Sequence, residues 1–183
     1  METLSVLKKE IVVNKSVCRF LTVFIFVILI GLGAFVRLPL PFTPVPITLQ
    51  TFFVLLSSGL LGFNLGIITQ LTYIALGQTG LPLFAGTGVF TAGYLFGFIL
   101  ASIFIASFIK YAKRQYLHTF IIFFIGDLLI LLCGSLWLKV FLGISLPKAL
   151  LLGFLPFIAG DLFKSLASTF VYQKLRNRVN EIL

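Results

Sequence analysis

Four of the seven prolines in this chain of 183 residues lie in one short stretch, Leu38–Gln50, between two apolar runs. Each proline fixes φ and removes a backbone donor, so the stretch cannot be a helix. It is nevertheless apolar apart from Thr43, Thr48 and Gln50. If the flanking runs span a membrane, irregular backbone beside them is tolerated only where protein buries it or where it lines a cavity. The stretch therefore predicts an extended crossing that forms the wall of a cavity.

The composition shows that the flanking runs do belong to a membrane protein. Hydrophobic residues make up 60% of the chain and charged residues only 10%. Soluble domains are about a quarter charged and under half apolar. The length is that of one domain. We therefore predict a single all-α integral membrane protein.

Six apolar runs are long enough, or nearly so, to cross a bilayer. The second and third are short and are separated by a predicted tight turn at Gly62–Asn64. A second irregular, mostly apolar connection, Leu81–Gly93, precedes the fourth run. The first run ends in small residues, Gly31–Ala34, where another element could approach closely. We predict six transmembrane helices at residues 20–36, 51–61, 65–76, 94–109, 119–138 and 149–172, with a loop at 139–148 and interruptions of the last helix at Pro156 and Gly160.

Basic residues at the ends of these runs predict the orientation. With both termini in the cytosol, ten basic residues lie inside and three outside, as the positive-inside rule requires. The inside set is Lys8, Lys9, Lys15, Arg19, Lys110, Lys113, Arg114, Lys174, Arg176 and Arg178, and the outside set is Arg37, Lys139 and Lys148. This predicts a cytosolic lead-in over 1–19, a transmembrane domain over 20–173 and a basic cytosolic tail over 174–183. Both irregular connections then face the outside. No basic face or base-stacking motif accompanies the charge, so nucleic-acid binding is not expected.

The apolar runs contain two acidic residues, Asp127 and Asp161, and one clear cation, Lys164. Charges at membrane depth are costly and indicate a functional site by default. Asp161 and Lys164 stand three residues apart, so on a helix they share one face. Together they offer acceptors and donors that match an amide- or urea-like group of a solute. The alternative is an internal ion pair that only holds the helix in register.

Asp127 lies near mid-depth in the fifth run, with no second acid or histidine at relay spacing. We expect a buried carboxyl bonded to a serine, a threonine or the backbone of a neighbouring helix, and proton coupling is the alternative. The sequence has no GxxxxGK[ST] loop, no GxSxG elbow and no HExxH or Ser/His/Asp set. Neither an ATP site nor enzyme activity is therefore expected in this chain. A single histidine and the absence of a metal-ligand spacing predict no metal and no cofactor.

A family resemblance is carried first by Pro39–Gly62, with the sequence PLPFTPVPITLQTFFVLLSSGLLG. This segment resembles the signature of the BioY biotin transport proteins, the substrate-capture (S) components of energy-coupling-factor transporters. Further similar segments follow in order and end with LPFIAGDLFKS at Leu155–Ser165. The resemblance covers the chain from about Phe20 to the sixth run. It implies a compact S-component bundle in the cell membrane, with a biotin pocket near the external face.

The resemblance also implies roles for individual residues. The GDxxK motif falls on Asp161 and Lys164, which in the family contact the biotin head group. A ureido ring would give two N–H donors to the carboxylate and a carbonyl to the ammonium. The expected apolar wall residues are Phe42, Leu81, Phe84 and Tyr94, and the expected polar contacts are Thr43, Thr48, Gln50, Thr87 and Thr91.

The resemblance implies partners as well, namely a membrane scaffold subunit and two cytosolic ATPases that drive biotin uptake. A solitary or proton-linked transporter, with Asp127 as the coupling group, is an alternative. A structural membrane subunit that binds no solute is another. Of the two irregular connections, we expect Leu38–Gln50 to be a fixed wall. Gly86–Phe98, which is shorter here than is common in the family, is expected to be a moving lid.

Overall fold

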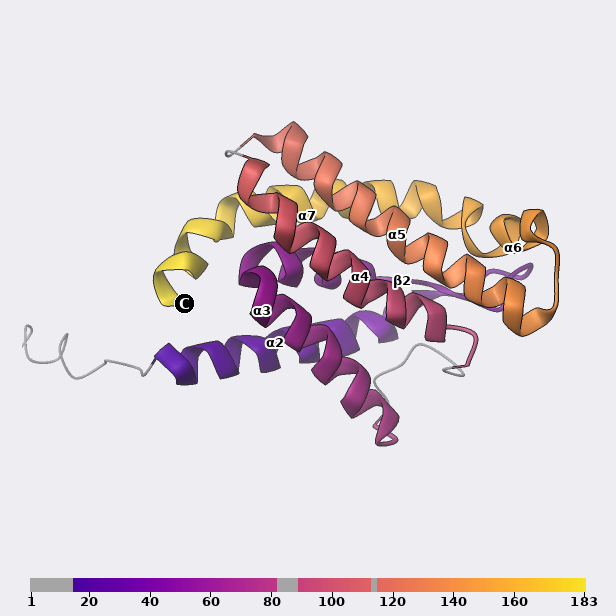
Figure 1. The fold of residues 1–183 in the computed structure, drawn as a ribbon, viewed down its shortest axis with the longest axis horizontal. Helices are drawn as coiled ribbons and strands as arrows, with labels where there is room; N and C mark the ends of the chain where they lie inside the picture. Colours follow the sequence, from indigo (N-terminus) through magenta and orange to yellow (C-terminus); the bar gives the residue numbers. More distant parts are fainter. Residues whose placement is uncertain (1–14, 82–88, 113–114) are drawn as a thin grey trace, which may run out of the picture.

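The computed structural model describes residues 15–81, 89–112 and 115–183 and shows a bundle of long helices (Figure 1). The helices are α2 (Lys15–Phe35), α3 (Gln50–Gln78), α4 (Ala92–Phe108), the 3-10 helix η1 (Ile109–Ala112), α5 (Tyr116–Leu142), α6 (Leu146–Gly153) and α7 (Leu155–Ile182). Two strands of two residues each, β1 (Arg37–Leu38) and β2 (Ile47–Thr48), lie between α2 and α3. The all-α prediction is confirmed apart from this strand pair.

Four helical segments are long and apolar enough to cross a bilayer: α2, α3, α4 with η1, and α5. α6 and α7 bend by 41° where they meet, and they add a fifth candidate span within the described residues if the bent pair is counted as one. Large apolar side chains such as Phe20, Phe163 and Phe170 are exposed on the outer surface of the bundle. An exposed apolar surface of this extent is typical of a protein surrounded by lipid.

The turn predicted between the second and third runs is a break inside α3. Gly62 has φ 71° and ψ −165°, a conformation that only glycine adopts readily. No atom lies within 4 Å of the place where a Cβ would stand, so the backbone conformation and not crowding requires glycine here. The two halves of α3, residues 50–61 and 63–78, are about 18 and 24 Å long. Both are shorter than the roughly 30 Å hydrocarbon core of a bilayer.

Several element boundaries differ from the prediction. The predicted loop at 139–148 is wrong, because α5 continues into it and only residues 143–145 separate α5 from α6. Gly160 does not interrupt the last helix, which breaks at Phe154 instead. Pro156 lies in the first turn of α7, where its missing N–H has no partner to lose, so it starts the helix rather than breaking it.

The first and the last described helices extend beyond the bounds predicted for the transmembrane domain. α2 begins at Lys15, inside the predicted lead-in. α7 runs to Ile182, through the predicted tail. The termini of α2 and α7 approach each other: the Arg19 guanidinium donates from Nε and Nη2 to the main-chain oxygen of Leu183, at 3.3 and 3.0 Å.

The proline-rich stretch forms a short hairpin that is fastened to the end of α2. β1 and β2 pair antiparallel. The Leu49 N–H donates to the carbonyl oxygens of Gly33 and Val36, both at 3.1 Å. A Cβ on Gly33 would lie 3.0 Å from the backbone nitrogen of Gln50, so the close approach predicted at the small residues of the first helix is present. The hairpin is thus held in a fixed place beside the start of α3.

α4 and α5 pack closely because glycines line their contact. A Cβ on Gly93 would lie 2.1 Å from the Cβ of Trp137, and one on Gly97 would lie 2.8 Å from the Cα of Ile130. Small residues allow helix backbones to approach in this way. The Trp137 indole N–H also donates to the carbonyl of Val89, at 2.7 Å. These contacts set the position of α4 relative to α5.

Candidate solute-binding site

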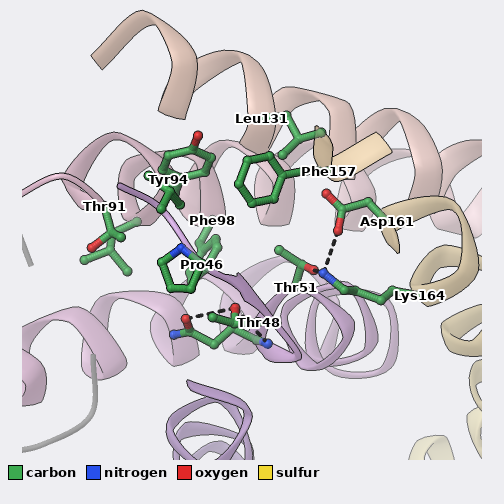
Figure 2. A pocket seen from close by; sticks show the side chains of 13 residues that line it. Pro46, Thr48, Thr51, Thr91, Tyr94, Phe98, Leu131, Phe157, Asp161 and Lys164 are labelled. Atoms are coloured by element: carbon green, nitrogen blue, oxygen red, sulfur yellow. Dashed lines mark hydrogen bonds and ion pairs between the residues drawn. The ribbon is translucent and has the colours of Figure 1, made fainter. Parts of the chain in front are cut away.

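A cavity lies between the hairpin and helices α3, α4, α5 and α7 (Figure 2). The space between its atoms is about 520 Å³, of which only about 50 Å³ admits the centre of a water molecule. Its walls are mainly apolar, and a few polar groups converge on it, as is typical of a small-molecule site. The lining residues are Val45, Pro46, Thr48, Gln50, Thr51, Thr91, Tyr94, Leu95, Phe98, Leu131, Phe157, Asp161 and Lys164.

An ion pair forms one side of the cavity. The Lys164 Nζ lies 2.6 Å from the Asp161 Oδ1, and the two side chains are 12% and 2% exposed. The ammonium also donates to the Thr51 hydroxyl on α3, at 3.2 Å. Because an ammonium has three donors, these two bonds leave one more for a ligand. Among the described residues no other ion pair is found.

The position of this pair favours a binding role. Both charges lie in the membrane-spanning part of α7, where taking them out of water is costly. A buried ion pair is seldom more stabilising than a well-packed apolar pair of similar volume, so stability alone is a weak reason for it. Asp161 and Lys164 face a cavity rather than a closed helix contact (Figure 2). The pair can therefore accept and donate hydrogen bonds to one polar group of a solute.

Thr48 and Gln50 lie in the cavity wall but bond mainly to the protein. The Gln50 side-chain amide donates to the Tyr73 hydroxyl on the second half of α3. The Thr48 hydroxyl donates to the Gln50 side-chain oxygen at 3.2 Å and accepts from the Gln50 backbone N–H at 3.4 Å. These bonds tie the hairpin to α3. Both residues shape the cavity wall and fix its position.

Tyr94 and Thr91 lie on the side of the cavity away from the ion pair (Figure 2). The Tyr94 hydroxyl donates to the carbonyl of Gly153 at the end of α6, at 2.7 Å. Its ring lies 6.3 Å from the ring of Phe157. Tyr94 therefore offers its ring to the cavity, as an apolar wall, while its hydroxyl is used within the protein. Thr91 precedes the first residue of α4 and is also a lining residue of the cavity.

Three of the predicted site residues lie outside the cavity, and two others fall outside the described residues. Phe42 is 56% exposed and lies in a separate apolar groove beside α6. The Thr43 hydroxyl accepts a hydrogen bond from the Val45 backbone N–H at 3.3 Å and does not line the cavity. Leu81 is exposed and lies outside it. Phe84 and Thr87 lie outside the described residues, as do the first residues of the expected lid, whereas residues 92–98 of that lid belong to α4.

Several lining residues were not predicted. Phe157 stands four residues before Asp161 and so on the same face of α7, a spacing that could have indicated it. Thr51 follows Gln50 directly but carries no motif of its own. Leu95, Phe98 and Leu131 belong to continuous apolar runs in which every residue is a possible lining residue. Val45 and Pro46 lie in the stretch that was predicted to form a cavity wall, without being singled out.

Asp127 of α5 lies at the contact between α5 and α7. Its Oδ2 accepts the Ser165 hydroxyl of α7 at 3.3 Å, so the predicted bond to a serine of a neighbouring helix is present. The side chain is fully buried, and its Oδ1 has no hydrogen-bond partner among the described residues. Asp127 does not line the cavity.

Comparison with known proteins gives consistent results. Residues 7–181 match the model of the BioY family. The chain is 38% identical to a probable biotin transporter BioY of Pyrococcus horikoshii and 36% identical to the biotin transporter BioY of Thermotoga maritima. Each match covers 83% of this chain and 92% of the relative.

The fold is also similar to that of a solved structure. The crystal structure of the S-component for biotin from an ECF-type ABC transporter superposes with a TM-score of 0.83 and 26% identity. The match covers 91% of this chain and 95% of that one. Together with the apolar helices, these similarities identify a multi-pass membrane protein with the S-component fold. With the family match extending over nearly its whole length, this chain belongs to the BioY family.

Proposed function

We propose that this protein captures biotin in the cavity and delivers it across the membrane as the S component of an energy-coupling-factor transporter. The observation that carries the proposal is the Asp161–Lys164 ion pair, which faces an otherwise apolar cavity in a chain of the BioY family. The named relatives and the solved structure are described as biotin transporters or as a biotin S-component, which supports the same solute.

The proposed contacts follow from the chemistry of biotin. Its ureido ring has two N–H donors for the Asp161 carboxylate and one carbonyl for the remaining donor of the Lys164 ammonium. Hydrogen bonds with a charged partner are roughly twice as strong as neutral ones. The bicyclic ring would pack between Phe98, Phe157 and the ring of Tyr94. The tail would then extend toward Thr91, on the far side of the cavity (Figure 2).

We expect binding to widen the cavity, because only about 50 Å³ of it admits the centre of a water molecule. The hairpin is held by the Leu49 bonds to the end of α2 and by the Gln50 bond to Tyr73. Its prolines have few backbone conformations to exchange. We therefore expect the hairpin to keep its place while the cavity widens elsewhere. Hydrogen exchange with and without biotin tests this, and strong new protection in the hairpin would contradict it.

The finer topology is part of the proposal. Six crossings result if the two halves of α3 count as two short spans and the bent pair α6–α7 as one. The side of the membrane that carries both termini would hold ten basic residues and the opposite side three, which favours cytosolic termini. In that orientation the hairpin and the cavity mouth face the outside.

Energy for transport is proposed to come from partner subunits, a membrane scaffold and two ATPases, because the sequence holds no nucleotide-binding loop. Biotin uptake should therefore be lost when the protein is expressed in a host that lacks all energy-coupling-factor subunits. Radiolabelled biotin uptake by such cells, compared with cells that also express the subunits, measures this. Equal uptake in both would support the solitary transporter instead, and loss of that uptake in Asp127→Asn would make Asp127 its coupling group.

Phe157→Ala should weaken biotin binding by about fivefold, while Phe42→Ala should change it less than twofold. Phe157 is 4% exposed and contributes one ring face to the cavity, so the substitution removes part of a buried apolar contact, roughly 1 kcal/mol. Phe42 is a matched control of the same residue type in a different groove. Titration of both purified variants with biotin measures the effects. A larger loss in Phe42→Ala would place the solute outside this cavity.

A further inference from the structure

A second, more polar groove lies at the other end of the bundle. The space between its atoms is about 1440 Å³, of which about 770 Å³ admits the centre of a water molecule. It is bounded by α2, the break in α3, η1 and the last turns of α7. Arg176, which lines it, stands 15 residues after Asp161 on α7 and so about 22 Å further along the helix. Figure 1 shows this end of α7 near α2 and the bend of α3, away from α6. The groove is therefore separate from the proposed biotin site.

Three cations from three different elements line this groove: Arg19, Lys110 and Arg176. No acidic side chain is among its lining residues, and within the described chain none of the three forms an ion pair with a side chain. Arg19 donates to the main-chain oxygen of Leu183, which also lines the groove, so Lys110 and Arg176 are the two cations left for a ligand. The Nε and Nη1 of Arg176 are buried and have no hydrogen-bond partner among the described residues. The guanidinium instead lies 5.5 Å from the centre of the Tyr172 ring.

Buried guanidinium nitrogens without an acceptor carry a large desolvation cost. An anion in the groove would remove this cost. Phosphate is well matched to a guanidinium, because its oxygens can accept two parallel N–H bonds.

The break in α3 adds to the positive potential of the groove. Gly62 ends the first half of α3, and Phe63, Asn64 and Leu65 form the first turn of the second half. All four residues line the groove. A helix start carries partial positive charge and backbone N–H groups that favour anions. This helix start therefore supports the same ligand chemistry as the three basic side chains.

The rest of the lining is apolar, which favours an amphiphile over a free ion. Leu60, Leu61 and Ile109 line the groove, and the exposed Phe63 lies at its rim. Phe20, next to Arg19 in the sequence, is exposed on the outer surface of α2. We propose that this groove binds the phosphate headgroup of an anionic membrane lipid, with an acyl chain lying against Phe63. Basic pockets between transmembrane helices are known to bind anionic headgroups in this way.

The proposal is tested by titrating the full-length protein in neutral detergent with short-chain phosphatidylglycerol, and with phosphatidylcholine of the same chains, by native mass spectrometry. Phosphatidylglycerol should bind more tightly. Arg176→Gln and Lys110→Gln should each weaken it by about fivefold, as expected for the loss of one cation at a headgroup. The matched control is Lys148→Gln, which removes an exposed cation outside the groove and should have no effect.

Several results would overturn the proposal. They are equal binding of the two lipids, unchanged binding in the Lys110→Gln variant, or an effect of Lys148→Gln as large as that of the groove variants. Inorganic phosphate binding as tightly as phosphatidylglycerol would make the groove a site for a free anion. An acidic peptide that binds more tightly than the lipid would assign it to a protein partner. Since Lys110 is exposed and outside the packed core, its variant decides the question even if Arg176→Gln does not fold.

Discussion

Asp161→Ala is expected to lower the affinity for biotin at least tenfold. Among the described residues Asp161 provides the only carboxylate that lines the cavity, so the substitution removes the proposed acceptor for the ureido N–H groups. Hydrogen bonds to a charged group contribute about 1.5 to 3 kcal/mol each, so the loss of one is enough for a tenfold change. The variant also leaves the Lys164 ammonium without its 2.6 Å partner, in a position that is only 12% exposed.

Lys164→Ala should give a loss of similar size, because it removes the proposed donor to the ureido carbonyl and leaves Asp161 buried without its counter-charge. Equilibrium binding of radiolabelled biotin to the purified variants measures both effects. Asp161→Asn keeps the size of the side chain and separates the loss of charge from the loss of packing. Thr43→Ala is the control, since the hairpin hydroxyl it removes lies outside the cavity and should leave affinity unchanged. Wild-type affinity in both charge variants would contradict the site assignment.

Gly93→Ala is expected to destabilise the fold by about 2 kcal/mol or more and to weaken biotin binding. An added Cβ would meet the Cβ of Trp137 at 2.1 Å and the carbonyl oxygen of Cys133 at 2.8 Å. Neither atom is the far end of a flexible side chain, so α4 and α5 must move apart, as in other overpacked contacts. Because Tyr94 and Phe98 on α4 line the cavity, its shape would change as well.

The melting temperature of the purified protein in detergent, with and without biotin, tests this prediction. Gly160→Ala is a matched control within a helix. Its Cβ would meet only the Ile47 Cγ2, at the ordinary contact distance of 3.9 Å, so the substitution should leave stability unchanged or raise it slightly. A wild-type melting temperature in Gly93→Ala, or an equal loss in Gly160→Ala, would show that the α4–α5 contact is not as close as described.

For the proline-rich stretch, the sequence predicts the non-helical backbone well but predicts poorly which side chains line the cavity. Four prolines exclude a helix between α2 and α3, and the structure has a hairpin there that lines the cavity through Val45, Pro46 and Thr48. Which side chains of a hairpin point inward depends on its register and its attachment to α2. Phe42 was predicted to line the cavity because its side chain is large and apolar, but in this hairpin it lies in another groove.

The ion pair shows why some site residues can be found from one sequence. Asp161 and Lys164 stand out because charges are rare in membrane runs and because a spacing of three brings them to one helix face. Leu95 and Leu131 line the same cavity but look like every other apolar residue of their helices. Which apolar residues line the cavity depends on how the helices pack, and a uniformly apolar run does not indicate that packing.

Helix ends were harder to predict, because lysines and glycines that often mark a loop or a helix break lie inside helices in this chain. Lys139 and Lys148 suggested a polar loop, yet α5 runs to Leu142 with the first lysine in its last turn, where a cation is favourable. Gly160 suggested a break but lies inside α7, where neighbouring helices support the backbone.

The most direct test of the central claim is equilibrium binding of tritiated biotin to the purified, full-length wild-type protein without any partner subunit. If the cavity binds the ureido ring through Asp161 and Lys164, binding should be saturable, with one biotin per chain. A biotin analogue with a blocked ureido nitrogen should compete poorly, because it loses a donor to the carboxylate. Absence of saturable binding to a folded sample, or equal competition by the blocked analogue, would contradict the proposed function.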